Sequence, residues 1–231
     1  MYILFALFDF WFTFATMSET AKFEFYGLML SEPATFITDL LTAFLCIIFA
    51  VQIHKKYPGT RKNWKLFFVS MALASFTGAF AHLLIVYTKE YLKIVSWVLS
   101  GFPVLFAELG SLSLLKKLRL RRILGYICII QITAYMVFII LFQDFSVARI
   151  NLIAGLFVIV PAVQLLHYKG KLPPGNRLII SGLVLSLSIA FIHGLRISLH
   201  YRFNHNDLSH LVMMACLFTI YLGVRKSGSS I

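Results

Sequence analysis

Side chains that could bind a metal or move protons gather where an apolar stretch begins near the end of the sequence. The segment RFNHNDLSHLVMMACLF, residues 202–218, places His205, Asn206, Asp207 and His210 at the head of a hydrophobic run. Imidazole and carboxylate groups together suit a divalent cation, above all zinc. The same groups can also serve as general acid and general base.

Similar side chains recur at helical spacing in other apolar stretches. Seven residues of an α-helix return the direction to within roughly 20°, so residues at i, i+3 and i+7 line one face. The sets are Glu32, Thr35 and Asp39; Ser75, Gly78 and His82; and His193, Arg196 and His200, with Asp207 and His210 as a shorter set at i and i+3. Ionisable groups within a membrane are costly, so we expect each set to face the protein interior.

The stretches that carry these sets are long enough to cross a membrane. Of the 231 residues, 60% are hydrophobic and only 13% are charged, unlike a soluble domain. A helical span needs about 20 mostly apolar residues, and the short alternating segments of a barrel do not occur. Seven blocks qualify: 28–53, 66–88, 91–115, 123–143, 146–167, 178–200 and 207–224. We therefore predict an all-α seven-transmembrane helix bundle that forms one domain, residues 28–226, followed by a short cytoplasmic tail, residues 227–231.

The basic residues predict the orientation of this bundle. The net charge is +12, but fifteen of the 21 Lys and Arg residues lie in the predicted loops 54–65, 116–122 and 168–177 and at positions 225 and 226 near the C-terminus. Five lie on the opposite side, and Arg196 falls inside a predicted span. This asymmetry argues against nucleic-acid binding. It places the C-terminus in the cytoplasm and the start of the first core span outside.

Residues 1–27 are set apart from the bundle as an apolar N-terminal segment. The first seventeen, MYILFALFDFWFTFATM, contain Asp9 and lack the basic start of a signal peptide. They fit an extra short span, an interfacial helix, or an over-called start upstream of Met17 or Met29.

The polar sets are expected to lie at a similar depth on the non-cytoplasmic side. We predict His82 and His210 as two zinc ligands, with Asp207 as the third ligand and His193 and His205 as its competitors. Asp39 and Glu32 would act as general base or orient a ligand imidazole, and Ser75 or Thr77 could steady an oxyanion.

Structural roles compete with these functional ones. Glu32 can cap its helix, and Arg196 can neutralise a buried carboxylate. His54 and His167 lie beside basic loops, which favours an interfacial role. Glu108 lies deeper, towards the cytoplasmic half, and the spacing assigns it no role.

Three short motifs resemble those of the seven-span superfamily that joins alkaline ceramidases with progestin and adipoQ receptors, often called CREST. SEPATFITDLLTA, residues 31–43, resembles the acidic element of the first core span through Glu32 and Asp39. SFTGAFAHLL, residues 75–84, resembles Ser-x-x-x-His through His82, and NHNDLSHLVM, residues 204–213, resembles His-x-x-x-His through His210. The resemblance implies an intramembrane zinc hydrolase of a lipid amide or ester, with the metal near the face where the first core span begins.

The chain departs from these motifs at three positions. Gly78 stands one turn before His82, where the superfamily has serine, and Asn206 stands four residues before His210, where it has histidine. Lys93 replaces the acidic residue that usually follows the second-span histidine by about eleven places. The missing ligand would come from Asp207, His205 or His193, or else this branch has lost the metal.

The function expected from the sequence is therefore a zinc-dependent hydrolase whose substrates and partners are membrane lipids. One alternative is a transporter or an ion or proton pathway that uses the same ionisable cluster, and another is a receptor without chemistry. Transport sites tend to lie near the midplane, whereas this cluster is predicted on one side. A retinal photoreceptor is excluded, because residues 207–224 contain no lysine for a Schiff base.

Overall fold

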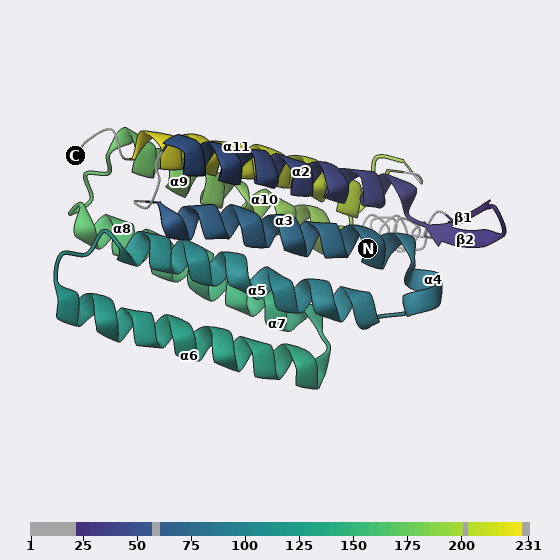
Figure 1. The fold of residues 1–231 in the computed structure, drawn as a ribbon, viewed down its shortest axis with the longest axis horizontal. Coiled ribbons are helices and arrows are strands. Elements are labelled where there is room, and N and C mark those ends of the chain that lie inside the picture. Colours follow the sequence, from purple (N-terminus) through teal and green to yellow (C-terminus); the bar gives the residue numbers. More distant parts are fainter. Residues whose placement is uncertain (1–21, 57–60, 201–202, 228–231) are drawn as a thin grey trace, which may run out of the picture.

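The chain folds into a bundle of apolar helices that run back and forth along one axis (Figure 1). The structure, a computed structural model, describes residues 22–56, 61–200 and 203–227. Its helices are α2 (Pro33–Lys56), α3 (Lys62–Leu83), α4 (Ile85–Thr88), α5 (Tyr91–Leu112), α6 (Leu118–Phe142), α7 (Phe145–Leu152), the π-helix η1 (Ile153–Ile159), α8 (Val160–His167), α9 (Pro174–Leu185), α10 (Leu187–Gly194) and α11 (His205–Lys226). They make seven segments long and apolar enough to cross a membrane. The prediction of an all-α seven-span bundle is therefore confirmed, and the chain is a multi-pass membrane protein.

A β-hairpin precedes the first span, which therefore begins later than the predicted residue 28. Strands β1 (Lys22–Phe25) and β2 (Leu28–Ser31) pair antiparallel. Tyr26 and Gly27 join them with φ values of 49° and 78°, as a two-residue hairpin turn of type I′ requires. Helix α2 starts only at Pro33, where the missing N–H of proline leaves no hydrogen bond unmade. Residues 1–21 lie outside the described residues, so the predictions for them stay predictions.

The sixth span ends earlier than predicted. It consists of α9 and α10 and stops at Gly194 instead of residue 200. Arg196 follows with a φ of 48°, outside the helical region. The predicted helix face of His193, Arg196 and His200 is therefore wrong, and only His193 lies on the helix. Gly194 is a weak helix former, which favours an end at this point.

The fifth span changes pitch in its middle, where α7 continues into η1 and then α8. Gly155 of η1 packs directly on α5. A Cβ atom there would stand 2.2 Å from Val104 Cγ1 and 2.5 Å from Glu108 Oε1. Short π-helical segments within helices occur frequently at functional sites.

The largest core lies among α2, α3, α5, α9 and α11. Phe49 of α2 stacks on Tyr221 of α11 with ring centroids 4.2 Å apart, and Phe68 of α3 meets Phe49 edge-on. Between α9 and α11 the backbones approach closely, since a Cβ on Gly223 would stand 2.7 Å from the carbonyl oxygen of Gly175. Small residues at such contacts are typical of helices packed within membranes.

One end of the bundle collects the elements that carry the predicted site. Helices α2 and α11 begin there, α3 and α10 end there, and the hairpin and α4 lie alongside (Figure 1). Short connections make successive spans antiparallel, so alternate helix ends share one face. The fold therefore gathers residues that are far apart in the sequence.

Candidate functional site

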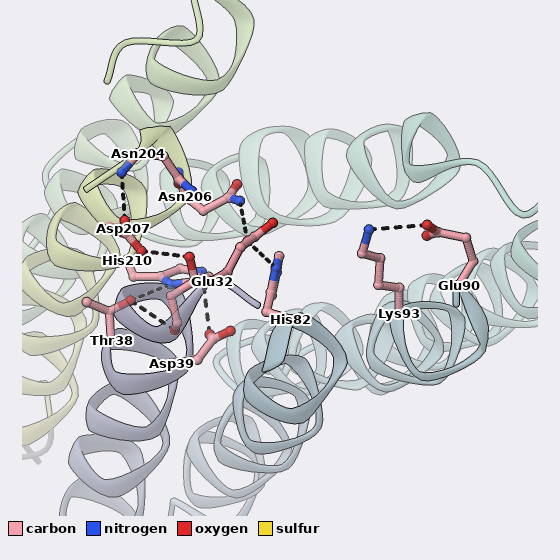
Figure 2. A network of polar contacts seen from close by, with 11 residues as sticks. Glu32, Thr38, Asp39, His82, Glu90, Lys93, Asn204, Asn206, Asp207 and His210 are labelled. Carbon is pink, nitrogen blue, oxygen red and sulfur yellow. Dashed lines mark hydrogen bonds and ion pairs between the residues drawn. The ribbon is translucent and has the colours of Figure 1, made fainter. Parts of the chain in front are cut away.

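Polar side chains from the start of α2, the end of α3 and the start of α11 meet in what we call the end cluster (Figure 2). Its members are Glu32, Thr35, Thr38, Asp39, His82, Asn206, Asp207 and His210. Five of the residues predicted from the sequence are thus brought into one cluster. The carboxylates of Asp39 and Asp207 are buried, with 4% and 1% of each residue exposed.

The first part of the cluster joins His82 in the last turn of α3 to Glu32, which directly precedes α2. His82 Nδ1 lies 2.7 Å from Glu32 Oε2, and Asn206 Nδ2 donates to the same oxygen at 3.3 Å. Burial on its own would raise the pKa of Glu32. The hydrogen bonds from His82 and Asn206 and the charge of His82 outweigh burial and lower this pKa below its ordinary value of 4.5. Glu32 is therefore an ionised carboxylate at neutral pH.

The second part of the cluster is a line from Thr38 through His210 to Asp39. His210 Nδ1 lies 3.0 Å from the Thr38 hydroxyl oxygen, and His210 Nε2 lies 3.4 Å from Asp39 Oδ1. Both ring nitrogens of His210 thus face a polar group of α2. The ring can donate from Nε2 to Asp39 and accept from Thr38, or donate from Nδ1 to Thr38, depending on the tautomer. This order of hydroxyl, imidazole and carboxylate is the arrangement used for general-base catalysis.

Asp39 owes its position partly to a glycine on α3. A Cβ on Gly78 would stand 3.1 Å from Asp39 Oδ2 and 3.2 Å from the Ser96 hydroxyl oxygen of α5. Gly78 is where the CREST motif has serine, and here its missing side chain makes room for the carboxylate. Ser75 lies a further turn from His82, is buried, and makes no hydrogen bond to the end cluster within the described residues.

Asp207 joins the first turns of α2 and α11. Its Oδ1 accepts from the Thr35 hydroxyl at 2.7 Å, and its Oδ2 accepts from the backbone N–H of Asn204 at 2.7 Å. The second contact is half of a capping box, in which the Asn204 side chain accepts from the backbone N–H of Asp207 in return. The Asn204 side chain also accepts from Asn206 N–H at 2.7 Å. Both oxygens of Asp207 are therefore used in holding the helix ends together.

His193 and His205 lie apart from the two carboxylate–imidazole pairs. Their rings meet edge to face with centroids 5.4 Å apart. His205 Nδ1 is buried and has no hydrogen-bond partner in the described part of the chain. The structure therefore places these two competing ligands against each other, and within the described residues neither forms a hydrogen bond or ion pair with Glu32, Asp39 or His210.

The arrangement meets only part of what a zinc site needs. The Nδ1 atoms of His82 and His210 are each held by a neighbour, as is usual for metal-binding histidines. A catalytic zinc takes three protein ligands, and residues 22–56, 61–200 and 203–227 contain no group of three or more His, Cys, Asp or Glu side chains placed to hold a metal ion. The residues as arranged do not fit zinc, and zinc stays a prediction.

Thr38 is the member of the end cluster that spacing alone did not single out. It lies one position before Asp39 and outside the Glu32, Thr35 and Asp39 register. It does follow Thr35 by three residues, and Thr38 donates to the Thr35 carbonyl oxygen at 3.1 Å. A search for hydroxyl residues beside the predicted carboxylate would have found it.

Comparison with known proteins places the whole helical region in one family. No curated protein and no solved structure matches the chain. The resemblance to the CREST superfamily therefore stays a resemblance. A family model matches residues 34–229. This region includes Asp39, His82 and His210 and begins two residues after Glu32. The chain thus belongs to the family described as Family of unknown function (DUF6962).

Proposed function

We propose that this protein is an integral-membrane hydrolase of a lipid amide or ester and that the end cluster is its reaction site. The observation that carries the proposal is the line from the buried Thr38 through the half-buried His210 to the buried Asp39, beside the pair of Glu32 and His82. Two carboxylate–imidazole pairs at one point supply the base and the acid that hydrolysis requires. The one-sided position of the cluster favours an enzyme over a transport site near the midplane.

The Asp39 and His210 pair provides the base. His210 takes a proton at Nδ1 from a water molecule that replaces the Thr38 hydroxyl there, as the water oxygen forms a bond to the substrate carbonyl carbon. Asp39 holds the imidazole in place and stabilises its protonated form, so Asp39 is a positioning residue. The Thr38 hydroxyl holds His210 Nδ1 before water enters and then donates to the Thr35 carbonyl oxygen alone.

The Glu32 and His82 pair provides the acid. When the carbon–nitrogen or carbon–oxygen bond breaks, the leaving amine or alcohol takes a proton from His82 and the carbonyl forms again. His82 is suited to this step because its side chain is 21% exposed and its Nε2 has no hydrogen-bond partner among the described residues. Exchange with water returns both imidazoles to their starting states.

The surroundings suit a lipid substrate. The cluster lies at one end of a membrane bundle, and the hairpin beside it exposes apolar side chains, including Phe25 and Leu28. The distribution of Lys and Arg supports a position near the non-cytoplasmic face, with the C-terminus in the cytoplasm. A lipid carbonyl at the interface would lie at a similar depth.

The test is hydrolysis by the purified protein in detergent. A panel of fluorogenic long-chain acyl amides and acyl esters is assayed with the wild type, His210→Ala and His82→Ala, and with His54→Ala as a matched control. His54 is an exposed histidine near the opposite end of α2. The proposal expects turnover by the wild type and His54→Ala and loss in the other two variants. Equal turnover in all four proteins, or none in any, would overturn it.

A second candidate function is that of a proton pathway through the membrane, and the position of Glu108 supports it. This residue is an almost fully buried acid in the half of the bundle opposite the end cluster, with 1% of its surface exposed. Ionisable residues at two depths are typical of proton-conducting membrane proteins. The two functions separate in proteoliposomes loaded with a pH-sensitive dye, where a pathway gives proton flux without lipid cleavage.

A further inference from the structure

Glu108 is an ionisable residue that the end cluster does not use. It lies near the end of α5, and its Oε1 has no hydrogen-bond partner among the described residues. None of the ion pairs within residues 22–56, 61–200 and 203–227 includes it. A carboxylate without a counter-charge is strongly disfavoured at such a position. The carboxyl group of Glu108 must therefore be neutralised, either by a bound cation or by a proton.

The packing around Glu108 leaves room for a proton and not for a metal ion. Gly155 of η1 closes one side, since a Cβ there would overlap both Glu108 Oε1 and Val104 Cγ1. The Cys128 thiol and the Gln131 amide of α6 also lie beside Glu108, with Gln131 Nε2 near Gly155. Hard cations such as Ca²⁺ and Mg²⁺ need about six or more oxygen ligands. The apolar wall at Val104 and the close approach of Gly155 do not supply them.

A line of neutral polar side chains links this position to the nearer end of the bundle. Ser111 follows Glu108 by one turn on α5 and accepts from Gln164 Nε2 at 3.3 Å. Gln164 Oε1 in turn accepts from Asn176 Nδ2 at 3.3 Å. All three side chains are buried, and Asn176 lies in the first turn of α9, at the end of the bundle with the basic loops. Apolar residues at these positions would seal the route.

The neighbours of Glu108 contribute few groups that titrate. The ionisable group beside it is the Cys128 thiol of α6. The other elements packed around α5 contribute neutral residues. They are Trp64 of α3, which packs against Gly110; Asn151 of α7, which is hydrogen-bonded to Gln131; Gly155 of η1; and Gln164 of α8. A pH-dependent change at this position is therefore assigned to Glu108 or Cys128, which a variant of Glu108 separates.

We propose that Glu108 is a proton-binding site of the membrane domain, reached through Asn176, Gln164 and Ser111, and that its protonation controls how α5 packs on η1. In the packing described here Glu108 is a neutral acid. When the proton leaves, the carboxylate needs new hydrogen-bond donors. The π-helical segment beside it can supply them, because its backbone groups can pair again in the commoner α-helical register. This site is independent of hydrolysis at the end cluster.

The test follows the proton directly by infrared difference spectroscopy, acid minus alkaline, on protein in lipid. We expect the carbonyl band of a protonated carboxylic acid in an apolar environment in the wild type and its loss in Glu108→Gln. Glu90→Gln is the matched control, because Glu90 is an exposed acid paired with Lys93, and it should leave the band unchanged. A band that survives in Glu108→Gln, or the absence of any pH-dependent band in the folded wild type, would overturn the proposal.

A second measurement is made on the wild type, so its outcome does not depend on whether a variant folds. Hydrogen–deuterium exchange of peptides covering Ile153–Ile159 is followed in the wild type at several pH values, after correction for the intrinsic exchange rate. We expect protection of this segment to fall as the acid band is lost, with peptides of α6 unchanged. Constant protection through the loss of the band would refute the link to η1. Glu108→Asp, which keeps an acid, should keep both responses.

Discussion

His210 Nε2 lies 3.4 Å from Asp39 Oδ1, across the interface between the last and the first core spans. The two residues are 171 positions apart in the sequence numbering; Asp39 is buried and His210 is half-buried. Their meeting joins an imidazole on α11 to a carboxylate on α2 at the end of the bundle where both helices begin.

Replacement of Asp39 by asparagine should reduce hydrolysis through its effect on His210. The amide keeps the shape of the side chain but removes the charge that stabilises a protonated imidazole. We expect kcat/KM to fall by roughly 100-fold or more, the usual scale of general acid–base catalysis, with a displaced pH profile. The double variant Asp39→Asn, His210→Ala should be no worse than His210→Ala alone, because the two residues act as one unit. Additive losses would show separate roles.

Removal of the Thr35 hydroxyl should weaken the attachment of α2 to α11. Thr35→Val leaves Asp207 Oδ1 buried without its donor, which costs about 1–3 kcal/mol. We expect a lower thermal unfolding midpoint in detergent. Thr133→Val is the control, because that hydroxyl is exposed and bonds only within its own helix. Equal midpoints for the two variants would mean that the contact to Asp207 contributes nothing.

The pH dependence of stability should contain a contribution from Glu32. Its pKa in the folded protein is lowered below 4.5, so its ionised form is the one that folding favours. The stabilisation is complete above that ordinary value and is lost as the pH falls through the folded-state pKa. Thermal midpoints measured at decreasing pH should therefore fall more steeply for the wild type than for Glu32→Gln. Parallel curves of midpoint against pH for the two proteins would show that Glu32 does not contribute to the pH dependence of stability.

Two glycine substitutions should act in opposite directions. Gly223→Ala places a Cβ 2.7 Å from the Gly175 carbonyl oxygen and 2.8 Å from Ile179 N, both backbone atoms that cannot give way cheaply, so we expect a lower unfolding midpoint. Gly125→Ala on α6 meets nothing within 4 Å and should stabilise by up to about 1 kcal/mol through helix propensity. Both are measured by thermal unfolding in the same detergent. A loss of stability in both would point to a general effect of glycine instead of helix contact.

Restoring the missing histidine tests the zinc prediction. Asn206→His would complete the His-x-x-x-His motif, one turn before His210 and near Glu32. We expect elemental analysis of the purified variant to show near-stoichiometric zinc that is lost in Asn206→His, His82→Ala, and a lower content in the wild type. Near-stoichiometric zinc in the wild type would instead show that three ligands assemble without a change in sequence.

The spans and the convergence of the site could be predicted because both follow from local rules. Apolar length located all seven segments, and spacing at i, i+3 and i+7 located Glu32, Asp39 and His82. The errors lie where tertiary contacts decide. The first span was predicted to start too early, because residues 28–31 pair as a strand. The predicted helix face ending in His200 was wrong, because α10 stops at Gly194.

The partners within the site were harder to predict than its members. Asp207 carries the residue type of a metal ligand, yet it is used by Thr35 and by the cap of α11. Nothing in the sequence separates a carboxylate that faces a cavity from one that bonds a helix end. The π-helix η1 likewise has no periodic signature, because its apolar residues read the same in either helical form.

The bond between Thr35 and Asp207 also bears on how the protein is made. Ribosomes deliver α2 to the membrane first among the described spans and α11 last. Glu32 can meet His82 as soon as α3 follows, but Thr35 and Asp39 wait through the insertion of the other spans before Asp207 and His210 arrive. Until α11 is inserted, the side chains of Thr35 and Asp39 on the first span lack their partners Asp207 and His210. Insertion of α11 therefore completes the site, and a nascent chain stalled before α11 would expose an unsatisfied polar surface in the membrane.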